Sequence, residues 1–392
     1  MPLILRPIRA PLASGPRSSI LPTTPGERIM GLFRAEAAEP AEDGCLPGLC
    51  LHGRRGFLKS FGAAALAAPS VALAQQPTPA PRRIDVHHHV YPTKWFAAKR
   101  DLILGSSDNP PTIMTQWTPQ RAVEQMDKHG IATSIACLGN PGVWFGDVQE
   151  ARALMRMCNE YMAQLGQDFP GRFGAFAALA LPDVEGCLNE IAYAFDTLKM
   201  DGVHLLTSYD DRWPGDPSFD PVFAELNRRK AVVFIHPTAP NCCGSLNTGA
   251  PPSILELPFD EARAVASLVF NGTVSKYPGI KFIFSHAGGP VPVLATRMDQ
   301  LMRNPKIAER VPDGVPATLK KLYFEVANST VNPSSMAALL ALSAPSQILF
   351  GSDYPYVQME KTVGGLDRLG YGRDLLGAIN RESALKLFPR FA

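Results

Sequence analysis

The sequence predicts an α/β protein whose main domain is a (β/α)8 TIM barrel, and three observations support this expectation. Short apolar runs alternate with helical stretches from residue 82 to the C-terminus. Eight such runs occur over about 310 residues, which agrees with the strand number and the length of such a barrel. No glycine-rich phosphate loop follows the first run, and this disfavours the competing fold, an open doubly wound sheet.

Most of the eight expected strands are continuous apolar runs, as strands buried on both faces of a parallel sheet are. In chain order they cover residues 84–87, 131–138, 173–179, 203–206, 232–236, 280–285, 322–326 and 348–350. Longer connections follow the first, fourth and fifth strands, at residues 91–117, 207–219 and 237–258. Barrels of this kind build their sites from the connections at the carboxyl ends of the strands.

Capping residues mark several helix boundaries between these strands. Thr118-Pro119, Asp220-Pro221 and Asn332-Pro333 each place a capping side chain before a proline at the first helical position. His129-Gly130 and Asn271-Gly272 are typical of helix ends. Helices are therefore expected between the strands, as the barrel requires.

Residues 1–81 differ in composition from the rest of the chain. Residues 1–50 are rich in Pro, Gly, Ala and Ser without a sustained period, and we expect a disordered leader there. Residues 51–81 are predicted to be a Tat-type signal peptide with its linker. The barrel domain is then expected over residues 82–392.

The signal peptide is predicted from features that occur in the right order. Arg54-Arg55 precede the mildly apolar run 61–74, which ends in a small-x-small sequence at Ala74. The alternative is a short amphipathic helix that carries two arginines, and translation starting at Met30 would shorten the leader. The pattern predicts export to the bacterial periplasm by the Tat machinery, with cleavage after Ala74.

The overall composition argues against several classes of partner. The formal net charge is +2 without a Lys/Arg block, so a nucleic-acid surface is not expected. No apolar stretch reaches the ~18 residues of a membrane span. The seven cysteines are odd in number and irregularly spaced, which fits neither a disulfide framework nor a C-x-x-C zinc site.

Five polar side chains stand at the carboxyl ends of four expected strands. His87 and His89 are two residues apart at the end of the first strand, so both point to the same side. His236 ends the fifth strand, His286 follows the sixth, and Asp353 follows the eighth. A buried core histidine would explain any one of them, but packing does not readily explain all five at one end. Imidazoles combined with a carboxylate suit Zn²⁺, Mn²⁺ or Fe²⁺.

Four motifs resemble those of the amidohydrolase superfamily, the metal-dependent hydrolase type of barrel. They are His-His-His at 87–89, His-Pro-Thr at 236–238, Ser-His-Ala-Gly-Gly at 285–289 and Gly-Ser-Asp-Tyr-Pro at 351–355. They are most similar to the branch of 2-amino-3-carboxymuconate-6-semialdehyde decarboxylase and related aromatic-acid decarboxylases. The stretch from residue 247 to Asp260 and Arg263 resembles decarboxylases of the 6-methylsalicylate type.

The resemblance implies one divalent metal ion, most often zinc and otherwise manganese, with His87, His89, His236 and Asp353 as its ligands. His286 would be the catalytic imidazole, with Asp353 as the second catalytic group. The fourth strand lacks the lysine that bridges two metals in binuclear relatives, so a single ion is expected. Some decarboxylases of the branch have Glu in place of His87. The family also implies a homodimer.

Two chemistries fit these residues. A decarboxylase would release CO2 from a small aromatic or muconate-like carboxylic acid, such as an ortho-hydroxybenzoate, with the proton supplied by Asp353 or His286. A hydrolase would use a metal-activated water on a lactone or amide. The loop resemblance favours decarboxylation, whereas a binding protein without catalysis is disfavoured because His286 and Asp353 are both present. Trp95 and Arg263 are candidate substrate contacts, although Trp usually packs in cores and Arg usually lies at the surface.

Overall fold

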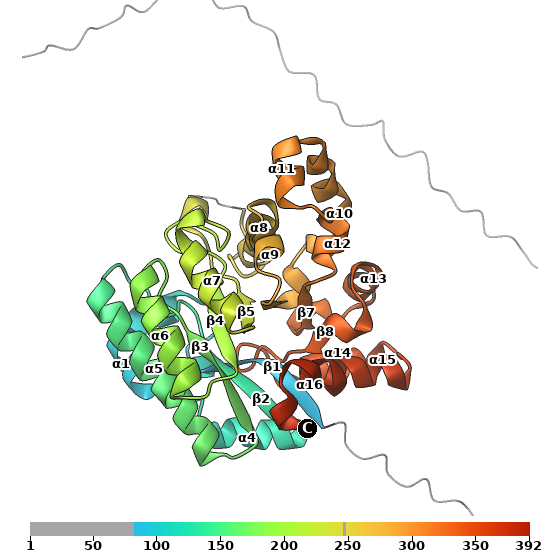
Figure 1. Ribbon diagram of the computed structural model, residues 1–392. Helices are drawn as coiled ribbons and strands as arrows, with labels where there is room; N and C mark the ends of the chain where they lie inside the picture. The colour runs from blue at the N-terminus through green and yellow to red at the C-terminus, as the bar shows by residue number, and fades with distance from the viewer. Residues whose placement is uncertain (1–81, 246–247) are drawn as a thin grey trace, which may run out of the picture. The chain divides into compact units, whose positions relative to one another are not determined.

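Eight parallel strands form one sheet in the order β1 to β8, with helices outside it (Figure 1). The computed structural model describes residues 82–245 and 248–392; the expected leader, signal peptide and cleavage site lie outside these ranges. The strands are β1 Arg83–Val90, β2 Ile131–Leu138, β3 Phe173–Ala178, β4 Gly202–Leu206, β5 Val232–His236, β6 Lys281–Phe284, β7 Tyr323–Val326 and β8 Ile348–Phe350.

Backbone hydrogen bonds bring the segment after β8 back to β1. The amide of Asp353 donates to the carbonyl of His87 at 2.9 Å, and that of His89 donates to the carbonyl of Tyr354 at 2.7 Å. These bonds join the last strand to the first and confirm the expected (β/α)8 barrel. They also hold the carboxylate that follows β8 next to the two imidazoles that end β1.

The longer helices alternate with the strands. The bounds are α1 Thr93–Ala98, α2 Arg100–Gly105, α3 Thr112–Thr115, α4 Pro119–Lys128, α5 Val148–Asp168, α6 Val184–Asp196, α7 Asp220–Arg228, α8 Glu256–Phe270, α9 Thr273–Lys276, α10 Val291–Asp299, α11 Pro305–Arg310, α12 Val315–Leu319, α13 Pro333–Leu342, α14 Met359–Arg368, α15 Arg373–Gly377 and α16 Ser383–Leu387. Three short helices, α1 to α3, thus lie within the connection 91–117. Within the described ranges, none of these helices has the length and apolar character to cross a bilayer.

Two of the three expected helix caps occur as predicted. The Thr118 side chain accepts from the amide of Arg121 at the start of α4, and Asn332 accepts from the amides of two residues at the start of α13. The prediction for Asp220 was wrong. A 3-10 turn at Pro217–Phe219 leads directly into α7, so Asp220 is already the first helical residue, and its carboxylate pairs with Lys276.

A separate apolar cluster fills the barrel interior below the polar strand ends. It combines inward-facing strand residues, among them Phe176 and Phe234, whose rings stack at 5.4 Å, with Phe388 and Phe391 of the C-terminal segment. The C-terminal segment therefore packs against the amino-terminal end of the barrel interior. The polar residues lie at the other end, where the carboxyl ends of the strands converge.

Candidate metal centre

Four side chains meet at the carboxyl end of the barrel. His87 and His89 come from β1, His236 ends β5, and Asp353 follows β8; one possible ligand atom from each lies within 4.8 Å of the others. The Nε2 atoms of His87 and His89 are 2.9 Å apart, and Asp353 Oδ1 lies 3.3 Å from each. All four residues are buried.

The chemistry of these donors fits a divalent cation. Burial lowers the pKa of His89 to about 4 and that of His236 well below its usual value, so both imidazoles are neutral and have a free lone pair. Burial alone would raise the pKa of Asp353, but the surrounding imidazoles of His87, His286 and His89 hold it well below the usual range. Nδ1 of His236 is buried and forms no hydrogen bond with any described residue, and buried Oδ1 of Asp353 has only the 3.3 Å contacts with the two imidazole nitrogens. A bound cation would satisfy both atoms.

Glu325, in the middle of β7, contacts the His87 ring at Nδ1, the nitrogen that faces away from His89 and Asp353. Its Oε1 lies 2.8 Å from Nδ1 of His87 and also accepts the backbone amide of His286 at 2.6 Å. Because a carboxylate oxygen accepts, Nδ1 of His87 carries the proton and Nε2 is free to face the cation. One oxygen atom thus positions a predicted metal ligand and the predicted catalytic histidine.

Asp85 supports the site through the backbone and not through a ligand imidazole. Its Oδ1 accepts the amides of His87 at 3.0 Å and Ser352 at 2.8 Å, and its Oδ2 accepts the hydroxyls of Ser134 and Ser352. Asp85 therefore links β1, β2 and the segment that follows β8. It fixes the chain on both sides of the ligand set.

His286 stands at the accessible edge of the cluster. Its side chain is 19% exposed, whereas those of His87 and His89 are 0% exposed. Its Nε2 lies 3.4 Å from Asp353 Oδ2 and its Nδ1 lies 3.2 Å from the Ser285 hydroxyl. Burial would lower the pKa of His286, but the carboxylates around it, first Asp353, raise it to about 9. His286 and Asp353 both have positive φ, 48° and 60°, which is strained for residues other than glycine.

Two tyrosines of the same region were not singled out from the sequence. Tyr91 continues the line of His87 and His89 on the same side of the chain, and the Tyr356 ring lies 4.9 Å from that of His89. Both hydroxyls are buried and lack a hydrogen bond of standard geometry within the described ranges. Burial raises the pKa of both phenols, and the nearby Tyr356 raises that of Tyr91 further. Parity with the histidines was the sequence signal that would have identified Tyr91.

The two predicted substrate contacts have protein partners. Trp95 is fully buried, and its indole nitrogen donates to the carbonyl of Gly142 at 3.0 Å. The guanidinium of Arg263 lies on α8, 3.5 Å from the Asp260 carboxylate, with 38% of its side chain exposed. Asp260 also accepts from Thr207 and Trp213. The role of Trp95 and Arg263 in substrate binding stays a prediction.

The remaining buried histidines do not join the ligand cluster. His88 packs outside the barrel between Phe173 and Tyr354, in agreement with its opposite parity. His204, within β4, stacks on Phe234, and burial lowers its pKa to about 3. Neither belongs to a potential metal-binding group among the described residues.

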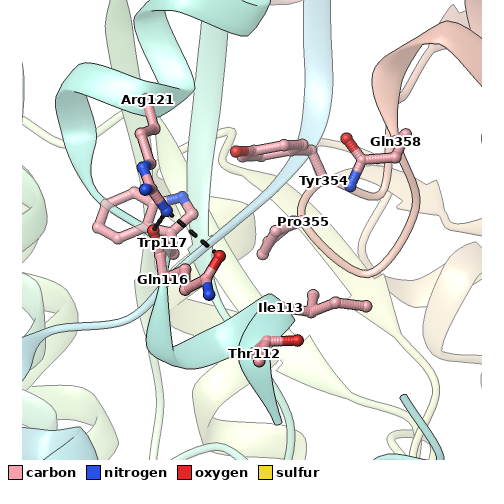
Figure 2. Close-up of a pocket in the computed structure, with 8 residues that line it drawn as sticks. All are labelled: Thr112, Ile113, Gln116, Trp117, Arg121, Tyr354, Pro355 and Gln358. Atoms are coloured by element: carbon pink, nitrogen blue, oxygen red, sulfur yellow. Dashed lines mark hydrogen bonds between the residues drawn. The ribbon is translucent and has the colours of Figure 1, made fainter. Parts of the chain in front are cut away.

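Two hollows lie around this end of the barrel. The one in Figure 2, of about 240 Å³, is lined by α3, the start of α4 and the segment Tyr354 to Gln358; Arg121 in it bonds to Gln116. None of the four cluster residues lines it. The other, of about 220 Å³, includes Leu206 and Thr238, and Leu206 pairs with His236 in the β4–β5 ladder. The second hollow therefore borders the candidate metal centre.

Comparison with known proteins assigns this architecture to a family. The chain matches the family described as Amidohydrolase over residues 84–390. It is 36% identical over 328 residues to decarboxylase yanB of Aspergillus niger, covering 79% of this chain and 88% of that protein. It is 34% identical over 316 residues to 6-methylsalicylic acid decarboxylase of Penicillium expansum, covering 79% and 96%.

A solved structure shows the same fold. 5-Carboxyvanillate decarboxylase of Novosphingobium aromaticivorans, complexed with manganese and a nitrobenzoic acid, aligns with a TM-score of 0.69 and 20% identity, covering 78% of this chain and 96% of that one.

Proposed function

The chain belongs to the amidohydrolase family and is an enzyme that acts as a decarboxylase, and from this premise we propose that its substrate is an ortho-hydroxybenzoate of the 6-methylsalicylate type. The relatives support decarboxylation and not the hydrolase alternative. The observation that carries the proposal is the position of His286. The proton-bearing ring of His286 lies at the accessible edge of the buried four-residue cluster, which suits a cation.

Decarboxylation of an aromatic carboxylate requires one proton. The proton bonds to the ring carbon that bears the carboxylate; the carbon–carbon bond then breaks, its electrons restore the aromatic ring, and CO2 leaves. A divalent ion held by His87, His89, His236 and Asp353 would supply positive charge for the substrate oxygens. His286 holds a proton on the open side of that cluster, whereas Asp353 is ionised and faces the imidazoles. His286 is therefore the better proton donor of the two.

The tyrosine hydroxyls complete the binding site in this proposal. Tyr356 lies beside His89, and Tyr91 lies beside Tyr356; both hydroxyls lack a hydrogen-bond partner among the described residues, and a phenol is a good donor to a carboxylate or phenolate oxygen. Asp210 and Asp211 line the neighbouring hollow and would repel an anion there. The substrate carboxylate would consequently point toward the cluster and the tyrosines.

The test is a parallel assay of full-length protein loaded with one divalent metal. 6-Methylsalicylate, 2,6-dihydroxybenzoate and a panel of lactones are supplied, and the release of CO2 and of acid is followed together. We expect CO2 from the hydroxybenzoates, fastest from 6-methylsalicylate, and a loss of at least ~100-fold in His286→Ala. Acid release from lactones without CO2 would overturn the proposal.

We propose zinc as the resident ion, with manganese as the alternative. The support is the ligand set, which has three imidazoles for one carboxylate and so suits zinc. Metal analysis of the protein as purified, followed by reloading of metal-free protein with each ion, tests this. Full activity with manganese but not with zinc would reverse the assignment.

We also propose that the chain is exported through the Tat machinery and forms a homodimer. The twin arginines at residues 54 and 55 support export, and the resemblance to the family supports the dimer. Fractionation of bacteria that express the full chain should place it in the periplasm, and replacement of both arginines by lysine should keep it in the cytoplasm. Light scattering should give twice the mass of one chain; a monomer mass would contradict the dimer.

A further inference from the structure

Glu261 is a buried carboxylate immediately behind the catalytic histidine. It lies on α8, is 0% exposed, and hydrogen-bonds through Oε1 to the hydroxyl of Ser285. Its Oε2 forms no hydrogen bond with the described part of the chain. Burying a carboxylate with so few partners is costly. Such a residue calls for an explanation other than packing.

A chain of hydrogen bonds leads from Glu261 to the open side of the cluster. The Ser285 hydroxyl donates to Glu261, and its oxygen lies 3.2 Å from Nδ1 of His286. A serine hydroxyl has a single proton, so once that proton is given to Glu261 the oxygen can only accept from the imidazole. Nδ1 of His286 must then carry hydrogen. Nε2 on the other side of the ring lies 3.4 Å from Asp353 Oδ2.

We propose that Glu261, acting through Ser285, fixes the orientation and the tautomer of His286 and is a positioning residue for decarboxylation. The effect on decarboxylation rests on the proposed function, whereas the positioning of the His286 ring does not. Nδ1 is kept as a donor toward Ser285, and Nε2 is kept as the atom that exchanges the proton with the substrate.

The surrounding backbone is built to hold this contact. The amide of Ser285 donates to the carbonyl of Ile235 in β5 at 3.1 Å, and Glu325 accepts the amide of His286. Glu325 therefore fixes the backbone of His286, while the bond from Ser285 acts on its ring. Helix α8 is held close because Gly289 has no side chain; a Cβ there would lie 2.0 Å from the carbonyl oxygen of Pro258.

Two variants separate the acceptor role of Glu261 from its charge. Glu261→Met removes the acceptor at similar length, whereas Glu261→Gln removes the charge and keeps an oxygen that can accept from Ser285. We expect kcat to fall roughly 10- to 100-fold in Glu261→Met, with a much smaller change in KM, and to recover largely in Glu261→Gln. A merely structural role of the charge would affect both variants alike.

The matched control is Glu190→Met. Glu190 is also buried, at 2% exposure, and its partners Asn159 and Arg156 lie away from the candidate centre. This variant loses a buried carboxylate in the same way and should keep the wild-type kcat. Ser285→Ala should lose about as much activity as Glu261→Met, and the double variant little more, because both changes break the same chain of bonds.

A second measurement does not depend on catalysis. Nitrogen NMR of histidine-labelled, zinc-loaded protein distinguishes a protonated from an unprotonated ring nitrogen, and His286→Asn identifies the signals. At a pH where the His286 ring carries a single proton, we expect that proton on Nδ1 in wild type and in Glu261→Gln, and a mixture of tautomers in Glu261→Met. An unchanged tautomer in Glu261→Met overturns the inference, even if Ser285→Ala fails to fold. If wild type shows this tautomer but releases no CO2, the proposed function fails and the positioning role stands.

Discussion

At the scale of single residues, Glu325 shows how few atoms hold the centre together. One of its carboxylate oxygens accepts from the ring of His87 and from the backbone of His286, and Glu325 is completely buried. It therefore sets the tautomer of one predicted metal ligand and the place of the predicted catalytic histidine. A change at this residue should affect metal binding before it affects the fold of the outer helices.

We predict that Glu325→Gln weakens metal binding about 10- to 100-fold, because a neutral acceptor makes the His87 imidazole less basic and orients it less firmly. Competition with a chromogenic chelator measures the dissociation constant. Glu190→Gln, which also neutralises a buried glutamate, should bind metal as wild type does. Equal affinity in Glu325→Gln and wild type would show that His87 needs no such support.

The sequence could predict the ligand candidates but not their supports. His236 ends a run of four apolar residues, so a polar side chain at that point is conspicuous. Glu325 and Glu261 act on residues that are 238 and 24 positions away in the chain, and only the closed barrel brings them together. A glutamate inside the apolar strand 322–326 was the one available signal for Glu325.

At the scale of elements, local patterns determined where strands lie better than where helices begin. Three of the predicted strands, 131–138, 232–236 and 348–350, have the bounds of β2, β5 and β8, because apolar runs buried on both faces are unambiguous. The cap at Asp220 failed because the competing cap at Asp216 starts a 3-10 turn before it. The three helices within 91–117 carry no capping pattern strong enough to predict.

The contact between α8 and the turn after β6 depends on a single glycine. Gly289 has φ of 59° and ψ of −129°, and a Cβ would collide with Pro258 of α8. We predict that Gly289→Ala displaces α8, costs roughly 1–3 kcal/mol of stability from strain alone, and lowers kcat through the contact of Glu261 with Ser285. Urea unfolding and steady-state kinetics measure the two effects.

Gly370→Ala is the control for this prediction. Gly370 also has a positive φ, 66°, but nothing lies within 4 Å of a Cβ placed there. This variant should lose stability through backbone strain and keep its kcat. A Gly289→Ala protein with normal kcat would mean that the turn absorbs the extra methyl group without moving α8.

At the scale of the whole molecule, the fold places several titratable groups in one buried region. Burial holds the pKa of His89 at about 4, that of His204 at about 3 and that of His236 well below its usual value. The pKa of His286 is shifted the opposite way, to about 9. These opposite shifts make the stability of the metal-free protein depend on pH in two directions.

On the acid side, the unfolded chain takes up protons on its histidines as the pH falls below ~6.5, whereas buried His89, His204 and His236 do not. The folded state therefore loses stability between pH 6.5 and 5. Asp260 and Glu261 oppose this loss, because burial raises the pKa of each. These are two carboxyl groups, whereas three histidines contribute to the loss. The net change in this window is a loss.

On the alkaline side, folded His286 keeps its proton while the same residue in the unfolded chain has released it above ~6.5. The stability that comes from the raised pKa of His286 is fully present below that value and is lost as the pH rises toward 9. We therefore predict that the melting temperature of chelator-treated full-length protein is highest near pH 6.5. It should be at least ~2 °C lower at both pH 5 and pH 9, the shift that corresponds to about 1 kcal/mol in a domain of this size.

The His286→Asn variant tests whether His286 causes the decrease in melting temperature above pH 6.5. It should flatten the plot of melting temperature against pH between 6.5 and 9 and leave the decrease at acid pH in place. The comparison must be made without metal, since a bound cation replaces protons on the same nitrogens and hides their titration. A melting temperature that rises steadily from pH 6.5 to 9 would mean that the carboxylates around His286 do not hold its proton. The imidazole would then reach the substrate unprotonated at neutral pH, and the proton for the ring carbon would have to come from another group.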